Sequence, residues 1–161
     1  MKTLRIGTRQ SLLALAQSRL VADLIRTHQP EIETELVKVV TTGDLTSGPL
    51  AAVGGKGQFT AQLESAMRDG LVDMAVHSAK DVPISLDKEF TIAAVPERAD
   101  PRDALVSRYG VDLSLLRMGA RVGTGSLRRA AQLRYVREDL EIVPMRGNVD
   151  TRLRKVTGDT D

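Results

Sequence analysis

Short apolar segments that suit β-strands alternate, in the first half of this chain, with longer segments of helical periodicity. Strands are predicted at residues 3–9, 33–42, 71–78 and 90–96, and amphipathic helices at residues 11–28 and 58–70. Because parallel strands are joined through helices, this order favours a mainly parallel sheet with right-handed crossovers. The predicted fold class is therefore α/β.

A charged segment with two prolines, "PERADPRDA" at residues 96–104, interrupts the alternation. We interpret it as the crossing between two lobes, residues 1–97 and residues 98–161. In the second lobe, strands are predicted at residues 104–108, 120–125 and 140–145, and helices at residues 126–138 and 148–156. The chain stops just after a helix, where another buried strand is expected. The first lobe is therefore predicted to be nearly complete and the second to be truncated.

The helix predicted at residues 11–28 has a clear start and an apolar stripe. Ser11 precedes it and is expected to be its N-cap, as Ser126 is for the helix at residues 126–138. The residues predicted to face the core are Leu12, Leu15, Ala16, Leu20, Leu24 and Ile25. In the helix at residues 58–70 they are Phe59, Leu63, Ala66 and Met67.

The composition excludes several classes of protein. The chain has no cysteine, which excludes disulfides and thiolate metal sites and fits a reducing compartment. No segment approaches membrane-spanning length and the N-terminus lacks the apolar core of a signal peptide, so we expect a soluble cytoplasmic protein without a membrane partner. His77 and His28 lack metal-ligand spacing, so no metal site is predicted. Aromatic residues make up 2% of the chain, too few for the stacking platforms of a nucleic-acid-binding protein.

Four polar motifs come directly after predicted strands. They are "TRQS" at residues 8–11, "HSAKD" at 77–81, "GTGSLRR" at 123–129 and "RGN" at 146–148. In open α/β sheets, ligands bind beyond the carboxyl ends of the strands and near helix N-termini. Seventeen of the 23 basic residues are arginine, whose planar fork suits carboxylates or phosphates, so an anionic ligand is expected. The segment "GGKG" at residues 54–57 lacks P-loop spacing, and is either a loop that brings Lys56 over a ligand or a linker without a role.

Each motif also has a purely structural interpretation. Arg128 and Arg129 lie in a predicted first helical turn, where cations oppose the helix dipole unless an anion lies between them. The alternative there is a capped helix with two solvated arginines. Arg146 and Arg152 are explained equally well as ligand contacts or as surface residues. Asp81 is either a tuned acid–base group or a helix-capping residue.

Taken together, these motifs resemble those of the porphobilinogen deaminase family, also called hydroxymethylbilane synthases. The matching segments are "IGTRQSLLALAQ", "TTGD", "LAAVGGKGQFTAQLE", "DMAVHSAKDVP", "ERADPRDALVS", "VGTGSLRRAAQL" and "MRGNVDTRL". They occur in the family's order and cover nearly the whole chain. The resemblance implies three domains, of which the first two are similar to periplasmic binding proteins and hold the active site in the cleft between them.

The resemblance also implies an activity in tetrapyrrole biosynthesis, the route to porphyrins and heme. Enzymes of this family are transferases that join four porphobilinogen units head to tail into hydroxymethylbilane, with release of ammonia each time. They build the product on a dipyrromethane cofactor, which a cysteine of the third domain holds through a thioether. This chain has neither that domain nor a cysteine, so by itself we expect it to lack the full activity. The family is typically monomeric, whereas a truncated second lobe exposes a sheet edge through which this chain can self-associate.

Residue by residue, the resemblance assigns roles to the polar motifs. Asp81 matches the catalytic carboxylate, which helps to protonate the departing amine and stabilises the cationic azafulvene and the pyrrole N–H groups. The residues that match cofactor-binding positions, most of them contacts to acetate and propionate groups, are Arg9, Ser11, Lys80, Asp81, Ser126, Arg128, Arg129, Arg146 and Arg152. Of these, Arg9, Arg146 and Arg152 also match substrate-binding positions, and Lys56 matches a loop lysine over the active site.

Three positions depart from the family pattern. Leu12 replaces a proline, Ala52 a lysine and Gly125 a serine, so one loop charge and one carboxylate contact are missing. A second hypothesis is a small-anion-binding module without catalysis, which would use the same fold and the same helix-end sites. The carboxylate of Asp81 within a basic motif favours the enzyme, because a simple anion receptor has no need for it.

Overall fold

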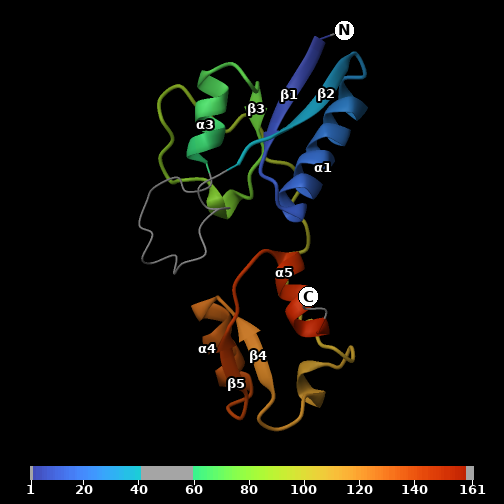
Figure 1. Cartoon of the computed structure of the whole chain (residues 1–161), viewed down its shortest axis with the longest axis vertical. Helices are drawn as coiled ribbons and strands as arrows, with labels where there is room; N and C mark the ends of the chain where they lie inside the picture. The colour runs from blue at the N-terminus through green and yellow to red at the C-terminus, as the bar shows by residue number, and fades with distance from the viewer. Residues whose placement is uncertain (1, 41–59, 159–161) are drawn as a thin grey trace. The chain divides into compact units, whose positions relative to one another are not determined.

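The computed structural model describes residues 2–40 and 60–158 (Figure 1). These residues belong to two units, Met1–Glu97 and Arg98–Asp161, each of which has its own sheet. The elements of the first unit are β1 (Lys2–Thr8), α1 (Leu12–His28), β2 (Ile32–Lys38), α3 (Ala61–Arg68), β3 (Met74–Ala75) and the 3₁₀ turn η1 (Ala79–Asp81). Those of the second unit are the 3₁₀ turn η2 (Leu113–Leu115), β4 (Arg121–Thr124), α4 (Leu127–Val136), β5 (Glu141–Pro144) and α5 (Val149–Thr157). All strand pairs are parallel among the described residues, so the predicted α/β class with mainly parallel sheets is confirmed.

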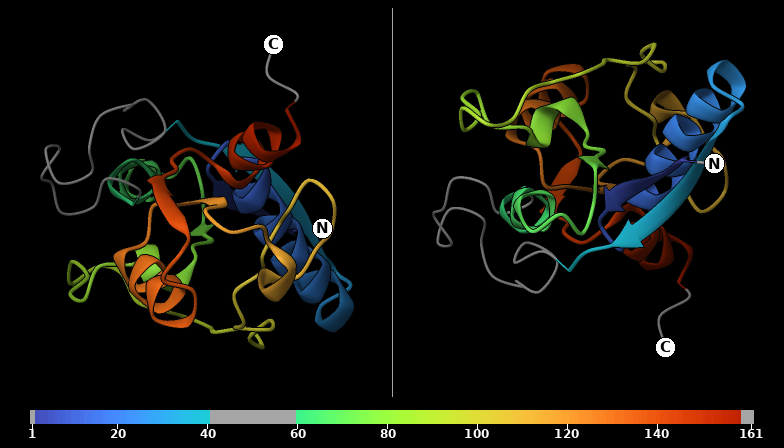
Figure 2. Two further views of the ribbon diagram at one scale, coloured as in Figure 1. Left: turned by 90° about the horizontal axis from the view of Figure 1, so that it is seen from below. Right: turned by 90° about the horizontal axis from the view of Figure 1, so that it is seen from above.

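The first sheet has the strand order β2-β1-β3, with β1 in the centre. Ile6 of β1 lies opposite Leu36 of β2 and Met74 of β3. Helix α1 packs on β1 and β2, and α3 packs on β1 and β3 (Figures 1 and 2). Because right-handed crossovers lead first to one side of β1 and then to the other, the two helices cover opposite faces of the sheet. The carboxyl ends of β1 and β3 therefore lie side by side.

The core of the first unit is centred on β1 and α3. Ile6 and Leu63 are both fully buried, with 0% of their surface exposed. Gly7 lies against the same leucine, since a Cβ at position 7 would be 2.8 Å from Leu63 Cδ2. The absence of a side chain at Gly7 thus lets α3 pack directly on the backbone of the central strand.

Two predicted helix caps are confirmed. Ser11 is the N-cap of α1, and its Oγ accepts a hydrogen bond from the backbone N–H of Ala14 at 3.3 Å. Ser126 is the N-cap of α4, and its Oγ accepts one from the N–H of Arg129 at 3.3 Å. Each bond satisfies an N–H that has no partner within its helix, which is why serine directly before a helical pattern predicts the start so well.

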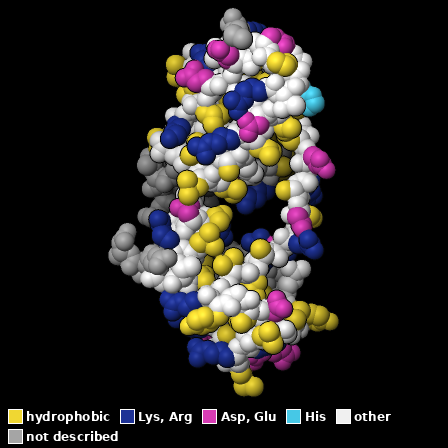
Figure 3. Space-filling model, turned by 90° about the vertical axis from the view of Figure 1, so that its right-hand side faces the viewer, with side chains coloured by type: hydrophobic (Ala, Val, Ile, Leu, Met, Phe, Trp, Pro, Cys, Tyr) yellow, Lys and Arg dark blue, Asp and Glu magenta, His cyan; other side chains and the backbone are white. Residues whose placement is uncertain are grey.

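Helix α1 buries only part of its predicted core face, because Leu15 is buried as predicted whereas Leu12, Leu20 and Leu24 are not. Its buried residues are Leu15, Ser18 and Ala22. The predicted core residues Leu12, Leu20 and Leu24 are instead 65%, 56% and 41% exposed, and Figure 3, which views the molecule from the side of α1, shows hydrophobic side chains exposed among Lys and Arg. Ser18 Oγ donates a hydrogen bond to Thr8 Oγ1 at 2.7 Å. The helix therefore contacts the sheet through Leu15 and two small residues, Ser18 and Ala22, which allow a close approach to β1.

The prediction of strands was wrong for two segments and too long for a third. Residues 90–96 form no strand and are largely exposed, with Ile92 at 60% and Val95 at 81%. Residues 104–108 also form none. An apolar segment becomes a strand only beside a hydrogen-bonding partner, and among the described residues neither segment has one. Of the strand predicted at residues 71–78, only β3 pairs with β1, because the chain then turns into η1.

In the second unit, β4 and β5 form a parallel pair in which Thr124 lies opposite Pro144. Its buried apolar residues are Ala120, Ala130 and Leu140. Arg137, just after α4, donates hydrogen bonds to the carbonyls of Leu113 at 2.9 Å and Leu116 at 3.1 Å, which ties the η2 segment to the end of the helix. The carboxyl ends of the two strands lead into the starts of α4 and α5, near which the predicted arginines lie.

Candidate functional site

In the first unit, the sheet brings Arg9 and Asp81 together although they are far apart in the sequence. Arg9 follows β1 and Asp81 ends η1, the turn that comes after β3. Arg9 Nη1 lies 3.9 Å from Asp81 Oδ2, and the two side chains are 15% and 24% exposed. The structure thus places a mostly buried carboxylate beside a guanidinium at the carboxyl end of the central strand.

The turn that carries Lys80 and Asp81 is attached to helix α1. The N–H of Asp81 donates to the carbonyl of Ser78 at 2.9 Å. The hydroxyl of Ser78 in turn donates to Gln17 Oε1 of α1 at 2.9 Å, across 61 residues of sequence. Lys80 is exposed on this turn. Gln17 is a contact that the sequence did not predict, because only the tertiary structure brings it to Ser78.

His77 lies beside the same carboxylate but stays uncharged. Burial lowers the pKa of His77, and the carboxylates of Asp81 and Glu64 only partly oppose that shift. The neighbouring Arg9 lowers it further. Its imidazole is therefore neutral at pH 7. Within residues 2–40 and 60–158, no group of three or more His, Asp or Glu side chains is placed to hold a metal ion.

Ser11 and Lys56 are the other predicted site residues of the first unit. Ser11 Oγ accepts the capping bond of α1, which leaves its own O–H free to donate to a ligand oxygen. Lys56 lies outside the described residues. The first unit thus places the Arg9 guanidinium beside the Asp81 carboxylate. Lys80 precedes Asp81 in the same turn, and Ser11 lies shortly after Arg9 at the start of α1.

In the second unit, the turn from β4 to α4 is tight. The N–H of Ser126 donates to Thr124 Oγ1 at 3.1 Å. At the residue between them, Gly125, a Cβ would lie 2.8 Å from the backbone oxygen of Met145. A serine at this position would therefore need the β4–α4 turn to move away from the end of β5.

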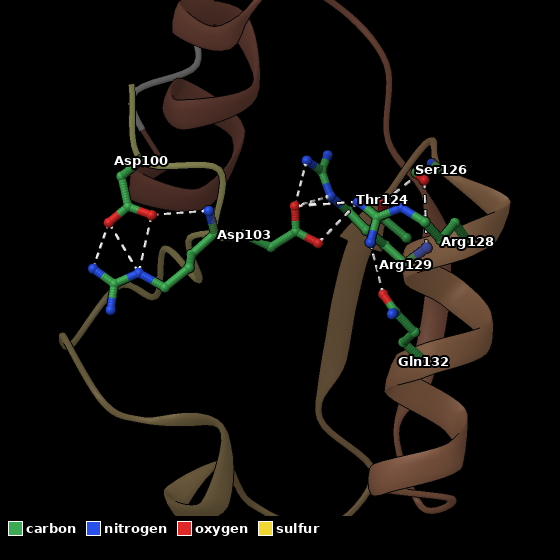
Figure 4. A network of polar contacts seen from close by, with 8 residues as sticks. Asp100, Asp103, Thr124, Ser126, Arg128, Arg129 and Gln132 are labelled. Atoms are coloured by element: carbon green, nitrogen blue, oxygen red, sulfur yellow. Dashed lines mark hydrogen bonds and ion pairs between the residues drawn. The ribbon is translucent and has the colours of Figure 1, made fainter. Parts of the chain in front are cut away.

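Arg128 and Arg129, in the first turn of α4, both bind the carboxylate of Asp103 (Figure 4). Arg129 donates to Oδ1 through Nε at 2.9 Å and Nη2 at 2.8 Å. Arg128 donates to Oδ2 through Nη2 at 3.1 Å and to Gln132 Oε1 through Nη1 at 2.8 Å. The hydrogen bond from Arg129, followed by that from Arg128, holds the pKa of Asp103 below its ordinary value. Asp103 is a second contact that the sequence did not predict.

Arg146 and Arg152 lie on either side of the start of α5. Arg146 is exposed, and its backbone carbonyl accepts a hydrogen bond from Lys155 Nζ at 3.2 Å. Arg152 Nε is buried and has no hydrogen-bond partner among the described residues. Leaving a buried donor without a partner costs free energy. Arg152 Nε therefore lacks the hydrogen bond that burial normally requires, and it has almost no exposed surface.

The arginine pair of the second unit suits a carboxylate. The Arg128–Arg129 pair already binds one carboxylate, that of Asp103, so its geometry accepts this group. Guanidinium groups bind carboxylates through paired N–H bonds, which adds geometric specificity to the attraction between charges.

Comparison with known proteins agrees with this chemistry. Residues 4–161 match the family described as "Porphobilinogen deaminase, dipyromethane cofactor binding domain". A porphobilinogen deaminase of Roseiflexus sp. (strain RS-1) is 53% identical over 156 residues, which cover 96% of this chain and 52% of the relative. One of Xanthomonas axonopodis pv. citri is 56% identical over 157 residues, which cover 97% and 52%. The chain thus spans about half the length of the curated relatives it matches.

The matched range includes every polar motif described above, from the end of β1 to the start of α5. None of the helices in the described part of the chain is long and apolar enough to cross a membrane. The family match extends over nearly all of the sequence, and the relatives share more than half of their aligned residues with it. The chain therefore belongs to the porphobilinogen deaminase family.

Proposed function

We propose that this chain supplies the catalytic carboxylate and the carboxylate-binding residues of a hydroxymethylbilane synthase. The enzyme would join four porphobilinogen units into hydroxymethylbilane and release ammonia at each step. The observation that carries the proposal is the pairing of Arg9 with Asp81 at 3.9 Å, in a chain that matches the porphobilinogen deaminase family. The proposal includes a cytoplasmic location. It also includes lobes similar to periplasmic binding proteins, and the parallel sheet and the motifs after its strands support this part.

The arginines would bind the acidic side chains of the pyrroles. Each porphobilinogen carries an acetate and a propionate group, so a growing product needs many cationic partners. A bound dipyrromethane supplies the pyrrole to which new units are joined. The residues that would hold it are Arg9, Ser11, Lys80, Asp81, Ser126, Arg128, Arg129, Arg146 and Arg152. Arg9, Arg146 and Arg152 would also bind the incoming substrate, and Lys56 would cover it.

Asp81 would move the proton in each condensation. When the carbon–nitrogen bond of the aminomethyl group breaks, ammonia leaves with a proton that the Asp81 carboxyl donates. The resulting carboxylate stabilises the positive charge left on the pyrrole. A carbon–carbon bond would then join this unit to the free α-carbon of the pyrrole that accepts it, and the proton displaced from that carbon would return to Asp81. The proton balance closes, and the neutral imidazole of His77 adds no competing positive charge.

The test compares turnover with binding in a chimera in which this chain replaces the matching half of the Xanthomonas axonopodis relative, which is 56% identical. Asp81→Asn is expected to lower hydroxymethylbilane formation by about 100-fold or more, the usual share of a general acid, while porphobilinogen still binds. Glu31→Gln, at an exposed position before β2, is the matched control and should leave turnover unchanged.

Two further outcomes decide between the hypotheses. Unchanged turnover in Asp81→Asn would contradict the catalytic role and favour the small-anion-binding module. The unfused 161-residue chain has no cysteine and should form no product, since the cofactor needs a thioether. Product formation by that chain would contradict the assigned role of the cofactor.

A further inference from the structure

Asp103 occupies the arginine pair that the proposed function assigns to a pyrrole carboxylate. It lies in a segment without helix or strand, 25 and 26 residues before Arg128 and Arg129. One of its oxygens accepts from Arg129 Nε at 2.9 Å and Nη2 at 2.8 Å, and the other from Arg128 Nη2 at 3.1 Å. In Figure 4 its carboxylate lies between the two guanidinium groups.

The bonds that Asp103 uses are those an external carboxylate needs. The Nε and Nη2 atoms of Arg129 form one edge of the guanidinium, and both donate to the same oxygen of Asp103, Oδ1. Paired N–H bonds along such an edge are the preferred way for arginine to bind a carboxylate. Arg128 uses a second of its nitrogens within the chain, because its Nη1 donates to Gln132. A ligand carboxylate that meets Arg129 along this edge must therefore displace Asp103.

The contact is exposed enough to exchange. The side chain of Asp103 is 38% exposed, and those of Arg128 and Arg129 are 60% and 44% exposed. Ion pairs that water can reach are weak, because solvent stabilises the separated charges. A ligand that also contacts other donors of the site can therefore replace this aspartate.

We propose that Asp103 is an internal carboxylate ligand of the Arg128–Arg129 pair, which a carboxylate of the bound pyrrole displaces. Asp103 keeps the two adjacent cations in place at the start of α4, where they would otherwise repel each other and oppose the helix dipole. Asp103 also lowers the affinity of the arginine pair for weakly binding anions, because each of them must compete with a carboxylate that is part of the chain. This inference rests on the proposed function, since it concerns the same arginine pair.

The experiment titrates porphobilinogen against the 161-residue chain and its variants by calorimetry. Asp103→Asn removes the competing charge, and its affinity should rise by about twofold to fivefold, the range that exposed ion pairs contribute to an equilibrium. Asp103→Glu retains a carboxylate and should return the affinity towards that of the wild type. Asp100→Asn is the matched control, because Asp100 lies in the same segment and pairs with Arg102 instead.

A second measurement reports on the contact without any ligand. In nitrogen-15 NMR spectra of the free chain, the Nε–H signal of Arg129 should exchange slowly with water in the wild type and faster in Asp103→Asn. Added porphobilinogen should shift this signal in both proteins. In Asp100→Asn the signal should behave as in the wild type.

The outcomes separate the inference from the proposed function. If Arg128→Ala weakens porphobilinogen binding while Asp103→Asn leaves it unchanged or weaker, the inference is wrong and the assignment of the arginine pair stands. If Arg128→Ala binds as tightly as the wild type, the pair does not bind the pyrrole and the assignment itself is wrong. A folded Asp103→Asn chain with an unchanged Arg129 signal would also contradict the internal contact.

Discussion

At the scale of single residues, a bidentate ion pair links β1 to the segment before β3. Arg5 donates to both oxygens of Asp73, through Nε at 3.1 Å and Nη2 at 2.7 Å. The backbone N–H of Arg5 adds a bond at 2.8 Å, and Arg5 Nη1 reaches the carbonyl of Gly70 at 2.6 Å. The bonds from Arg5 lower the pKa of Asp73 to about 2. The pair thus stabilises the folded chain only while Asp73 is ionised.

This pair predicts a pH dependence of stability. The pKa of Asp73 falls from 3.8 to about 2 on folding, so the stabilisation is fully present above the higher value and is lost as the pH falls through the lower one. The Asp73→Asn variant should have a lower free energy of unfolding than the wild type. This difference should be largest near neutral pH and should shrink as the pH approaches 2. Urea unfolding across this range measures it.

The control must separate this pair from the other charges nearby. Lys2 also faces Asp73, and Glu35 faces Arg5, so both remain in the variant. Glu33→Gln, at an exposed position of β2, should show no such change across the same range of pH. A deficit in Asp73→Asn that stays constant with pH would contradict the assigned pair.

At the scale of elements, the start of a helix was predictable and its buried face only in part. Ser11 and Ser126 cap helices within a few residues of themselves, so the local sequence contains all the information. The face of α1 depends on how closely it can approach β1. The apolar pattern correctly predicted Leu15, but it also favoured Leu20 and Leu24, whereas the structure buries Ser18 and Ala22.

The two faces of α1 predict opposite mutational results. Ala22 is 4% exposed, and Ala22→Leu should destabilise the chain by about 1–3 kcal/mol, because added methylenes force the helix away from the sheet. Leu20 is 56% exposed, and Leu20→Gln should change the stability by less than about 0.5 kcal/mol. Thermal and urea unfolding measure both. A larger loss of stability in Leu20→Gln than in Ala22→Leu would contradict the observed packing and favour the core face predicted from the sequence.

At the scale of the whole molecule, the boundary of the two units lies in an exposed segment of the chain. Residues 91–106 are exposed and lie outside every described helix and strand. The boundary between the units falls within it, between Glu97 and Arg98. Proteases cleave exposed chain without regular hydrogen bonding first.

Limited digestion with trypsin should therefore cut after Arg98 and Arg102 before it cuts after Arg129 or Arg134, which lie in α4. Mass spectrometry of the early fragments identifies the order. All four arginine side chains are exposed, so a difference in cleavage order reports on the structure of the backbone and not on access to the side chains. Earlier cleavage within α4 would contradict the division into two units.

The sequence alone sufficed to predict the α-helices and β-strands that formed, the two helix caps, and the polar motifs that follow the strands. These features depend on neighbours a few residues away, and short-range patterns encode them. Only the tertiary structure decided which face of α1 is buried, that residues 90–96 form no strand, and that Asp103 binds Arg128 and Arg129. Each of these depends on contacts between residues far apart along the chain, whose partners are chosen by packing and hydrogen bonding in the folded protein.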